Sequence, residues 1–356
     1  MNFPKFLVTG LFTFIASLFI SGCASTKPDP NHPMLAVLKQ FEHAPAMGPG
    51  ETKMPVRALP TNSITMHWPG KGLAQHPFLY YTEGNNFLYV VNHGKVVWTY
   101  APPHGGEMDD AWMMSNGHII GCRSGSCYEV TPQKEIVWSY LAPANTQIHS
   151  LQPVGLDKVM IVQNGLPPHL IVLNKKDNSI AFSHELPMFT NTIKSIHTQF
   201  RNCRVTAQGT YLLGNLDKGT IDEYDKDWNL IWHYDAIRPW SEVRLKNGNT
   251  LIPGDNRGFV HEVNPKGEIV WAIETNTLLG IVLRDVQTAD RLANGNTIIC
   301  NRGGSAKGSN PPQVIEVTPD KKVVWVLQDY KNLPSCTGIQ LLDEPGIPEN
   351  PGDLMR

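Results

Sequence analysis

A sequence unit that recurs along most of the chain constrains the fold more than any other feature. In residues 245–271 it contains the pair Asn-Gly, a short apolar run, the sequence Asn-Pro-Lys-Gly and finally Glu-Ile-Val-Trp. Asn-Gly favours a tight hairpin because both residues tolerate a positive φ, and proline presets the first corner of a β-turn. The unit recurs with small changes in residues 114–138 and 292–325. Short strands and tight turns in repeated units predict an all-β protein built from equivalent sheets.

The last strand of each unit ends in an aromatic residue, and these residues give the number of units. They are Trp98, Trp138, Phe182, Trp232, Trp271 and Trp325. Their spacing of 39–54 residues is near the length of a four-stranded propeller blade. The first unit lacks one strand, and the segment 338–343 near the C-terminus supplies it. We therefore predict a six-bladed β-propeller whose first blade is closed by the C-terminal strand, because this closure removes an open sheet edge.

The first 22 residues have the composition of a signal peptide. Lys5 precedes an apolar run at 6–20 that is too short for a comfortable membrane span. The run leads into Ile-Ser-Gly-Cys, which resembles a bacterial lipobox, and the resemblance implies cleavage before Cys23 and lipidation of its thiol. Several acyl chains hold a protein on a membrane far better than one. An ordinary signal peptide followed by an incidental cysteine is the alternative.

These features divide the chain into three parts. Residues 1–22 are the lipoprotein signal peptide, 23–70 a lipid-anchored, Pro-rich tether and 71–356 the six-bladed propeller. We expect an exported, periplasm-facing protein bound to the bacterial envelope through Cys23. Ala24 stands where an aspartate would retain an enteric lipoprotein in the inner membrane, which favours the outer membrane over the inner. The formal charge of −2 excludes nucleic acid as the main partner.

The repeats resemble those of bacterial propellers related to the pyrroloquinoline-quinone-like and arylsulfotransferase-like groups. The resemblance lies in Gly-Glu-Ile-Val-Trp and Asn-Gly-Asn-Thr-Leu-Ile, and it covers about residues 75–343. Quinoprotein dehydrogenases carry two adjacent cysteines beside the quinone. This chain has no adjacent cysteines, so we expect no cofactor. Arylsulfotransferases place histidines near the start of inner strands, which implies His149 and His197 as catalytic candidates. The sixth unit departs from that pattern, with Leu-Arg-Asp-Val-Gln at 283–287.

Loop length indicates which face of the ring carries function. In a blade, the turns between strands one and two and between strands three and four lie on one face, here called the turn face. The connections between strands two and three and between blades lie on the opposite face, here called the long-loop face. Those connections are long at 183–196, 272–283 and 301–313. Loops longer than closure requires usually carry binding, so we expect the ligand on the long-loop face.

Basic residues accumulate on that predicted face. They stand at or near a glycine at Arg123, Lys218, Arg257 and Arg302. Arg201, Arg244 and Arg284 are expected nearer the axis, with acidic residues such as Asp109 between them. Guanidinium groups suit carboxylate, sulfate or phosphate oxygens. A solvated hairpin charge is the alternative for each loop residue. We predict that a small anionic ligand or a glycan is bound by Arg244, Arg284, Asp285, Glu242, Asp110, Arg257 and Arg302.

Histidines and cysteines give the remaining candidates. His149, His197 and His104 are candidate ligands or bases, because neutral imidazole serves both roles. No His-x-His, Cys-x-x-Cys or His-Glu-x-x-His spacing occurs, so no metal site is predicted.

Cys122 and Cys127 flank Arg-Ser-Gly-Ser and are predicted to form a disulfide across a hairpin. Cys300 and Cys336 are candidates for a second disulfide, and the sequence leaves the pairing of Cys203, Cys300 and Cys336 open.

Two hypotheses for function follow, and the sequence leaves open whether the protein is an enzyme. The first is a non-catalytic binding module for a polar or anionic ligand or for a protein partner. The alternative is an arylsulfotransferase-like enzyme that uses His149 or His197. The binding module predicts varied side chains around the axis that do not converge on one point. The arylsulfotransferase-like enzyme requires a histidine with two or more cationic or amide groups around one point.

Overall fold

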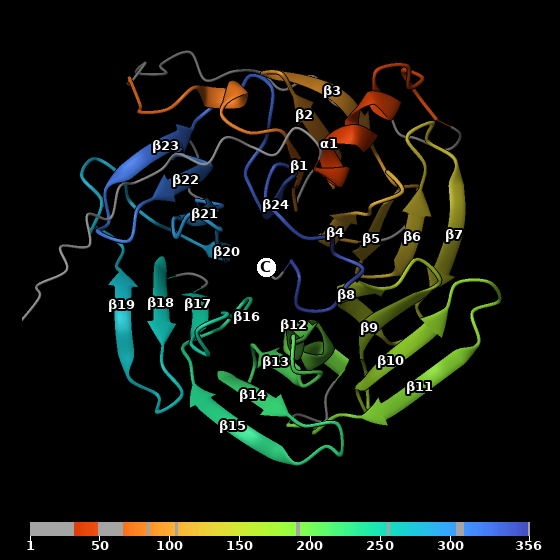
Figure 1. Cartoon of the computed structure of the whole chain (residues 1–356). Coiled ribbons are helices and arrows are strands. Elements are labelled where there is room, and N and C mark those ends of the chain that lie inside the picture. The colour runs from red at the N-terminus through yellow and green to blue at the C-terminus, as the bar shows by residue number, and fades with distance from the viewer. Residues whose placement is uncertain are drawn as a thin grey trace, which may run out of the picture.

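Six four-stranded antiparallel sheets form a ring in the computed structural model, as the repeats predict (Figure 1). The structure describes residues 32–48, 67–83, 86–103, 106–189, 193–254, 257–303 and 310–354. Cys23 and His104 therefore lie outside the described residues, as does the signal peptide. Within the described residues, no helix is long and apolar enough to cross a membrane.

Each blade is given from its inner to its outer strand. Blades one to three are β24 (Gly338–Leu341), β1 (Phe78–Tyr81), β2 (Leu88–Asn92) and β3 (Lys95–Tyr100); β4 (Met108–Met113), β5 (Ile119–Arg123), β6 (Ser126–Val130) and β7 (Ile136–Leu141); and β8 (Gln147–Val154), β9 (Lys158–Asn164), β10 (His169–Asn174) and β11 (Ile180–Glu185). Blades four to six are β12 (Phe200–Val205), β13 (Tyr211–Asn215), β14 (Thr220–Tyr224) and β15 (Leu230–Asp235); β16 (Val243–Arg244), β17 (Thr250–Gly254), β18 (Phe259–Val263) and β19 (Ile269–Ile273); and β20 (Val286–Arg291), β21 (Thr297–Asn301), β22 (Val314–Val317) and β23 (Val323–Leu327).

The C-terminal strand closes the first blade, as predicted. β24 pairs antiparallel with β1, from Phe78 opposite Leu341 to Tyr81 opposite Gly338. The pairing continues on both sides of the strand through backbone hydrogen bonds of 3.1 Å from Thr337 to Tyr81 and 2.9 Å from Leu342 to Pro77. The ring is thus joined by a strand from each end of the chain.

The repeated tryptophan joins blades one, four and five to the blade that follows each of them. The indole N–H of Trp98 donates to the backbone oxygen of Pro132 at 2.9 Å, and Pro132 lies in the turn between the outer two strands of blade two. Trp232 and Trp271 make the same contact with Pro265 and Pro319, at 3.1 and 2.8 Å. A buried indole needs such a partner, and the repeated proline turn presents a carbonyl for it. The recurrence of Pro and Trp in the sequence therefore reflects one interblade contact.

The repeated glutamate of the third strands forms a second interblade contact. Glu262 of blade five pairs with Arg291 of blade six at 2.7 Å, and Lys175 of blade three donates to Glu129 of blade two. Arg291 also lies 5.1 Å from the Trp271 ring. Each acid is thus neutralised by a cation from the following blade, as a buried charge requires.

Part of the segment expected as a tether is packed on the propeller. α1 (Pro33–Val37) and η1 (Leu38–Phe41) bury Met34, Val37, Leu38 and Phe41 against Trp98 and Tyr100. The spacing i, i+3, i+4, i+7 of these four residues forms one apolar helical stripe. Residues 33–41 are therefore not a free tether. Farther along, η2 (Gly72–Ala74) accepts the Trp325 indole N–H at Gly72, at 3.0 Å.

The C-terminal segment after β24 crosses the turn face and reaches the ring axis (Figure 1). Glu344 accepts the backbone N–H of Ala293 in blade six, and Glu349 accepts that of Ser115 in blade two, both at 2.8 Å. Leu354 is buried in a cluster with Trp112 and Ile148. The segment therefore covers the axis at the turn face, and the opposite end of the axis is the long-loop face.

Candidate functional site

Four inner strands share one irregularity close to their first residue. Their register against the neighbouring strand is interrupted by an extra residue, which is Asp109 in β4, His149 in β8, Arg201 in β12 and Gln287 in β20. Such β-bulges re-aim a side chain and are frequent beside functional sites. All four occur where the chain enters the inner strand, on the long-loop face. The bulged side chains and their neighbours make up an axial cluster, which consists of Glu83, Glu107, Asp109, Gln147, His149, His197, Arg201, Gln287 and Arg302.

His149 lies at the buried centre of the axial cluster. Its Nδ1 is 3.1 Å from Asp109 Oδ1, and its Nε2 is 2.9 Å from Gln147 Oε1. The side chains of His149 and Asp109 are 0% and 2% exposed. Burial, followed by the positive charges of Arg201 and His197, lowers the pKa of His149 well below its ordinary value. Burial raises the pKa of Asp109 to about 6, although Arg201 and His197 oppose the shift. His149 is therefore a neutral imidazole.

Arg201 carries the buried positive charge beside this histidine. Its Nη2 lies 3.3 Å from Glu107 Oε2 and 3.3 Å from Asp109 Oδ1, and Nη1 donates to the backbone oxygen of His197 at 3.0 Å. The guanidinium also lies 4.0 Å from the Trp240 ring. A buried guanidinium has to be paired in this way. The charge of Arg201 is thus already compensated within the cluster.

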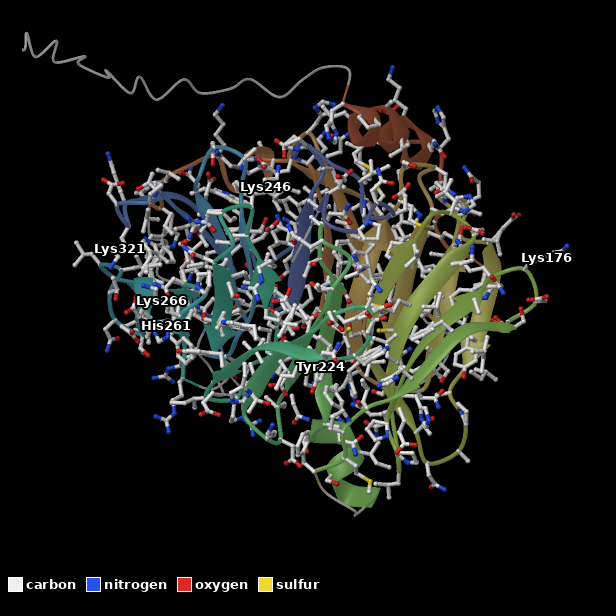
Figure 2. All side chains as sticks on the ribbon, turned by 60° about the horizontal axis from the view of Figure 1, so that its bottom comes forward. Lys176, Tyr224, Lys246, His261, Lys266 and Lys321 are labelled. Carbon is white, nitrogen blue, oxygen red and sulfur yellow. The ribbon has the colours of Figure 1, made fainter. Side chains whose placement is uncertain are left out.

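His197 and Glu107 form the solvent-facing side of the axial cluster. η3 (Ile193–Thr198) holds His197, whose Nε2 is 3.6 Å from Glu107 Oε2 and whose Nδ1 is 3.0 Å from Gln147 Oε1. The two side chains are 42% and 31% exposed. The rings of His149 and His197 meet edge to face with centroids 5.0 Å apart. Solvent therefore reaches the cluster from the side of η3, which projects from the long-loop face in Figure 2.

Blades one and six complete the axial cluster. Arg302 Nη2 lies 2.9 Å from Glu83 Oε1, and Gln287 Nε2 donates to Glu83 Oε2 at 2.9 Å. Burial raises the pKa of Glu83, with Glu107 and Asp109 adding to the shift, while Gln287 and Arg302 oppose it. The cluster holds three carboxyl groups and two guanidinium groups, each guanidinium bonded to a carboxylate. Its formal charge is therefore −1, whereas an anion-binding funnel would carry an excess of positive charge.

Two of the predicted ligand residues are buried, Asp110 directly after Asp109 in β4 and Glu242 directly before β16. Asp110 Oδ2 is 3.0 Å from Arg204 Nη2, and Arg204 lies 5.0 Å from the Trp112 ring. Glu242 is fully buried against Gly214, where a Cβ would lie 2.2 Å from its Oε2. Burial raises the pKa of Glu242 well above its ordinary value, although Arg204 opposes the shift. Asp110 and Glu242 are thus buried around Arg204 and are not exposed to a ligand.

The structure places other predicted residues on the long-loop face but away from the buried centre. Arg284 is exposed, and Asp285 beside it is buried with a φ of 48°. Arg257 borders a 400 Å³ cavity between blades four and five, together with Phe259 and His261. Arg302 belongs to the axial cluster through Glu83.

Arg244 does not lie near the axis, where it was predicted. Arg244 is the last residue of β16, and its Nη1 donates to Gly248 in the following turn at 3.0 Å. It pairs with Glu223 of blade four and lies 4.7 Å from the Trp232 ring, so it belongs to the interblade contacts. Figure 2 shows Lys246 of the same turn at the face opposite η3. Trp240, four residues earlier, contacts the axial cluster instead, with its ring 4.0 Å from the Arg201 guanidinium.

The predicted disulfide is absent from the structure. Cys122 and Cys127 do face each other across β5 and β6, but both are buried free thiols. Burial raises the pKa of both thiols, which keeps them in the protonated, unreactive form. Cys300 and Cys336 are likewise not joined by a disulfide, and both lie within one apolar cluster.

Several residues of the axial cluster were not singled out from the sequence. Asp109 was noted only as an acid among the basic residues, and Glu83, Glu107, Gln147 and Gln287 were missed as site residues. Asp109, Gln147 and Gln287 share a weak signal, since each is a polar residue at the first or second position of an inner strand. Glu107, His149 and His197 also offer atoms within 4.8 Å of one another that suit a metal ion.

Comparisons with known proteins support the fold. No protein-family model and no curated protein matches the chain. The crystal structure of a Bacteroides caccae protein of unknown function aligns with a TM-score of 0.66 and 23% identity, over 74% of this chain and 98% of that one. The β-propeller domain of Myceliophteria thermophila Cps50 (Swd1) aligns with a TM-score of 0.51 and 11% identity, over 76% and 89% of the two chains. At these identities the likeness shows the propeller fold alone.

Proposed function

We propose that this chain is a binding protein that holds a small polar ligand in the axial cluster. The observation that carries the proposal is the set of four bulges that direct Asp109, His149, Arg201 and Gln287 toward one end of the axis. A propeller ring closes without such bulges, so their recurrence beside polar side chains points to a function of those side chains. The partly exposed Glu107 and His197 give a ligand access to the buried residues behind them.

The pairing of both guanidinium groups with carboxylates favours a neutral, hydroxyl-rich ligand such as a glycan over an anion. Arg201 and Arg302 already bind carboxylates, so an anion would have to displace Glu107 or Glu83. A hydroxyl group both donates and accepts hydrogen bonds, and the cluster offers carboxylate acceptors beside amide and guanidinium donors. Such a ligand binds without leaving a buried charge unpaired.

The transferase alternative has weaker support. His149 does stand among a cation and an amide, Arg201 and Gln147, but both of its ring nitrogens are engaged and its side chain is 0% exposed. Two carboxylates, Glu107 and Asp109, adjoin the same guanidinium. They would repel a sulfuryl group, which is anionic. His197 remains accessible, but it has the Glu107 carboxylate beside it.

We further propose that the propeller is attached to the outer membrane of a bacterial envelope through lipidated Cys23. The lipobox-like Ile-Ser-Gly-Cys sequence and Ala24 support this location. An anchored propeller would present its binding face to ligands or protein partners at the membrane surface.

A thermal-shift screen tests the proposed ligand class. Neutral oligosaccharides are compared with sulfated, phosphorylated and carboxylated compounds, and we expect only neutral polar compounds to raise the unfolding temperature. Glu107→Ala and His197→Ala should abolish that shift. His261→Ala is a matched control, because His261 pairs with Glu274 at 2.8 Å outside the axial cluster. Stabilisation by anions alone, or an equal effect of the control variant, would contradict the proposal.

A further inference from the structure

Two imidazoles and one carboxylate converge on the solvent side of the axial cluster. They belong to His149 at the start of β8, His197 in η3 and Glu107 just before β4. The ligand atoms of all three lie within 4.8 Å of one another. Two histidines and one glutamate are a donor set that binds zinc in proteins and leaves further coordination positions open.

The separations suit one ion after small movements. Zinc–nitrogen and zinc–oxygen bonds of about 2.0–2.2 Å place neighbouring ligands of a tetrahedral ion roughly 3.3 Å apart. His197 Nε2 and Glu107 Oε2 are already 3.6 Å apart. Because both side chains are partly exposed, they can close the remaining gap to His149 by changing rotamer.

Asp109 provides the outer partner that metal-bound histidines need. Its Oδ1 lies 3.1 Å from Nδ1 of His149, and when that nitrogen carries the proton the lone pair of Nε2 is available to an ion. This tautomer requires Arg201 Nη1, which lies 3.0 Å from the same Nδ1, to turn away from it. A carboxylate behind the imidazole fixes the tautomer and the ring orientation in this way and strengthens the ligand. Gln147 Oε1, 2.9 Å from His149 Nε2 and 3.0 Å from His197 Nδ1, is a neighbouring oxygen that must turn aside or join the ion.

The neighbouring charges tolerate a divalent ion. Arg201 Nη1 lies 3.0 Å from His149 Nδ1, and its positive charge opposes binding. Glu107 and Asp109 both contact the same guanidinium and favour binding. With these two carboxylates and one guanidinium, the local formal charge is −1, and a divalent ion changes it to +1.

We propose that Glu107, His149 and His197 bind one divalent transition-metal ion, with Zn²⁺ as the ion that suits this donor set best. The exposed side chains of Glu107 and His197 leave the remaining coordination position facing solvent on the long-loop face. A hydroxyl oxygen of the polar ligand proposed above would occupy that position. The inference deepens the proposed function and rests on the same site.

Isothermal titration calorimetry, with ZnCl₂ titrated into the full-length chain, tests this site. The protein is purified in detergent without a histidine tag and freed of metal with EDTA. We expect one ion per chain. We also expect His197→Ala and Glu107→Ala to weaken binding at least about a hundredfold, and Asp109→Asn to weaken it about 10–100-fold as an outer partner. Each variant is first shown to unfold cooperatively by circular dichroism.

A second histidine–carboxylate group controls for adventitious zinc binding. His233 lies between Asp222 and Asp235 at 2.5 and 3.2 Å, outside the axial cluster. His233→Ala should leave the titration unchanged. The visible absorption of Co²⁺ in place of Zn²⁺ gives an independent readout, and its intensity should fall in His197→Ala but not in His233→Ala. No binding to the wild type, or equal losses in the control and axial variants, would overturn the metal site.

The metal site and the ligand site can fail separately. If an oligosaccharide stabilises the protein equally with and without EDTA and zinc does not bind, only the metal inference is lost. If zinc binds with the expected pattern of variants but no polar compound binds, the proposed ligand class is lost and the metal site stands.

Discussion

Glu316 Oε2 lies 3.3 Å from Nε2 of His76, so the last blade is bonded to the segment that leads into the first. The other ring nitrogen of His76 is 2.9 Å from Asp343, just after the closing strand β24. Glu316 occupies the place in its blade that Glu262 occupies in blade five, where the partner is Arg291. A histidine therefore replaces the arginine at the junction where the two ends of the chain meet.

This histidine should make stability depend on pH. Burial lowers the pKa of His76, but hydrogen bonds to Asp343 and Glu316 outweigh burial and raise it from 6.5 to about 9. The contribution to stability is fully present below pH 6.5 and is lost as the pH rises through 9. The shift corresponds to on the order of 3 kcal/mol. We expect the free energy of unfolding in denaturant to fall between pH 6 and pH 10 by more in wild type than in His76→Gln. Parallel pH profiles would contradict this.

The interblade tryptophans should be large contributors to stability. Trp98 is 3% exposed and donates to Pro132, so Trp98→Ala should cost about 3–5 kcal/mol in free energy of unfolding. Phe182 occupies the equivalent place in blade three but is 38% exposed. Phe182→Ala should therefore cost less than half as much. Chemical denaturation of both variants measures the difference, and similar costs would mean that the indole contact is not what joins the blades.

The repeat unit made the architecture predictable because its residues serve local contacts that recur in each blade. The Asn-Gly turn, the proline turn and the aromatic strand ending each have a chemical requirement that leaves a mark in the sequence. The closing strand was predictable for a related reason, since the first unit had one strand too few. The apolar stripe of Met34, Val37, Leu38 and Phe41 has the spacing of one helical face and could have been predicted. The Pro-rich sequence around it led to the interpretation as a tether instead.

The axial cluster was much harder to predict. Asp109, His149, Arg201 and Gln287 meet only after the ring closes, so no spacing between them is informative. Each depends on a bulge, and one extra residue leaves no recognisable mark in inner strands that mix polar and apolar residues. The position of Arg244 was also hard to predict. An inner strand of a few residues runs from one face of the ring to the other, so an error of a few residues places a side chain on the wrong face.

Deletion of the closing strand should open the ring. Removal of 338–356 leaves β1 with an unpaired edge next to the axis, and we expect cooperative thermal unfolding to be lost. Removal of 343–356 retains β24 and takes away the contacts of Asp343, Glu344 and Glu349. This shorter truncation should unfold cooperatively at a lower temperature. If both truncations behave alike, the strand pairing is not what holds the ring closed.

The lipid anchor is tested by fractionation. Cys23→Ser removes the thiol that would carry the lipid, and we expect the variant to leave the membrane fraction in which the wild type is found. Ser21→Ala, which keeps Cys23 and a small residue two positions before it, should remain with the membrane. A Cys23→Ser protein that still sediments with membranes would rule out lipidation as the anchor.

Substitutions of Arg244 and His197 distinguish a charge that stabilises the fold from a side chain that binds the ligand. The side chain of Arg244 is 9% exposed and that of its partner Glu223 is 11% exposed. Arg244→Ala therefore leaves the nearly buried carboxylate of Glu223 without a positive partner. Breaking such a pair should cost about 3–5 kcal/mol in free energy of unfolding, and the double variant Glu223→Gln with Arg244→Met should recover much of that cost. His197→Ala, in which a partly exposed residue is lost, should leave stability nearly unchanged. Ligand binding should respond in the opposite order, with a large loss in His197→Ala and none in folded Arg244→Ala protein. If Arg244→Ala instead weakens the ligand and leaves unfolding unchanged, the turn-face pair takes part in binding and the axial cluster is not the ligand site.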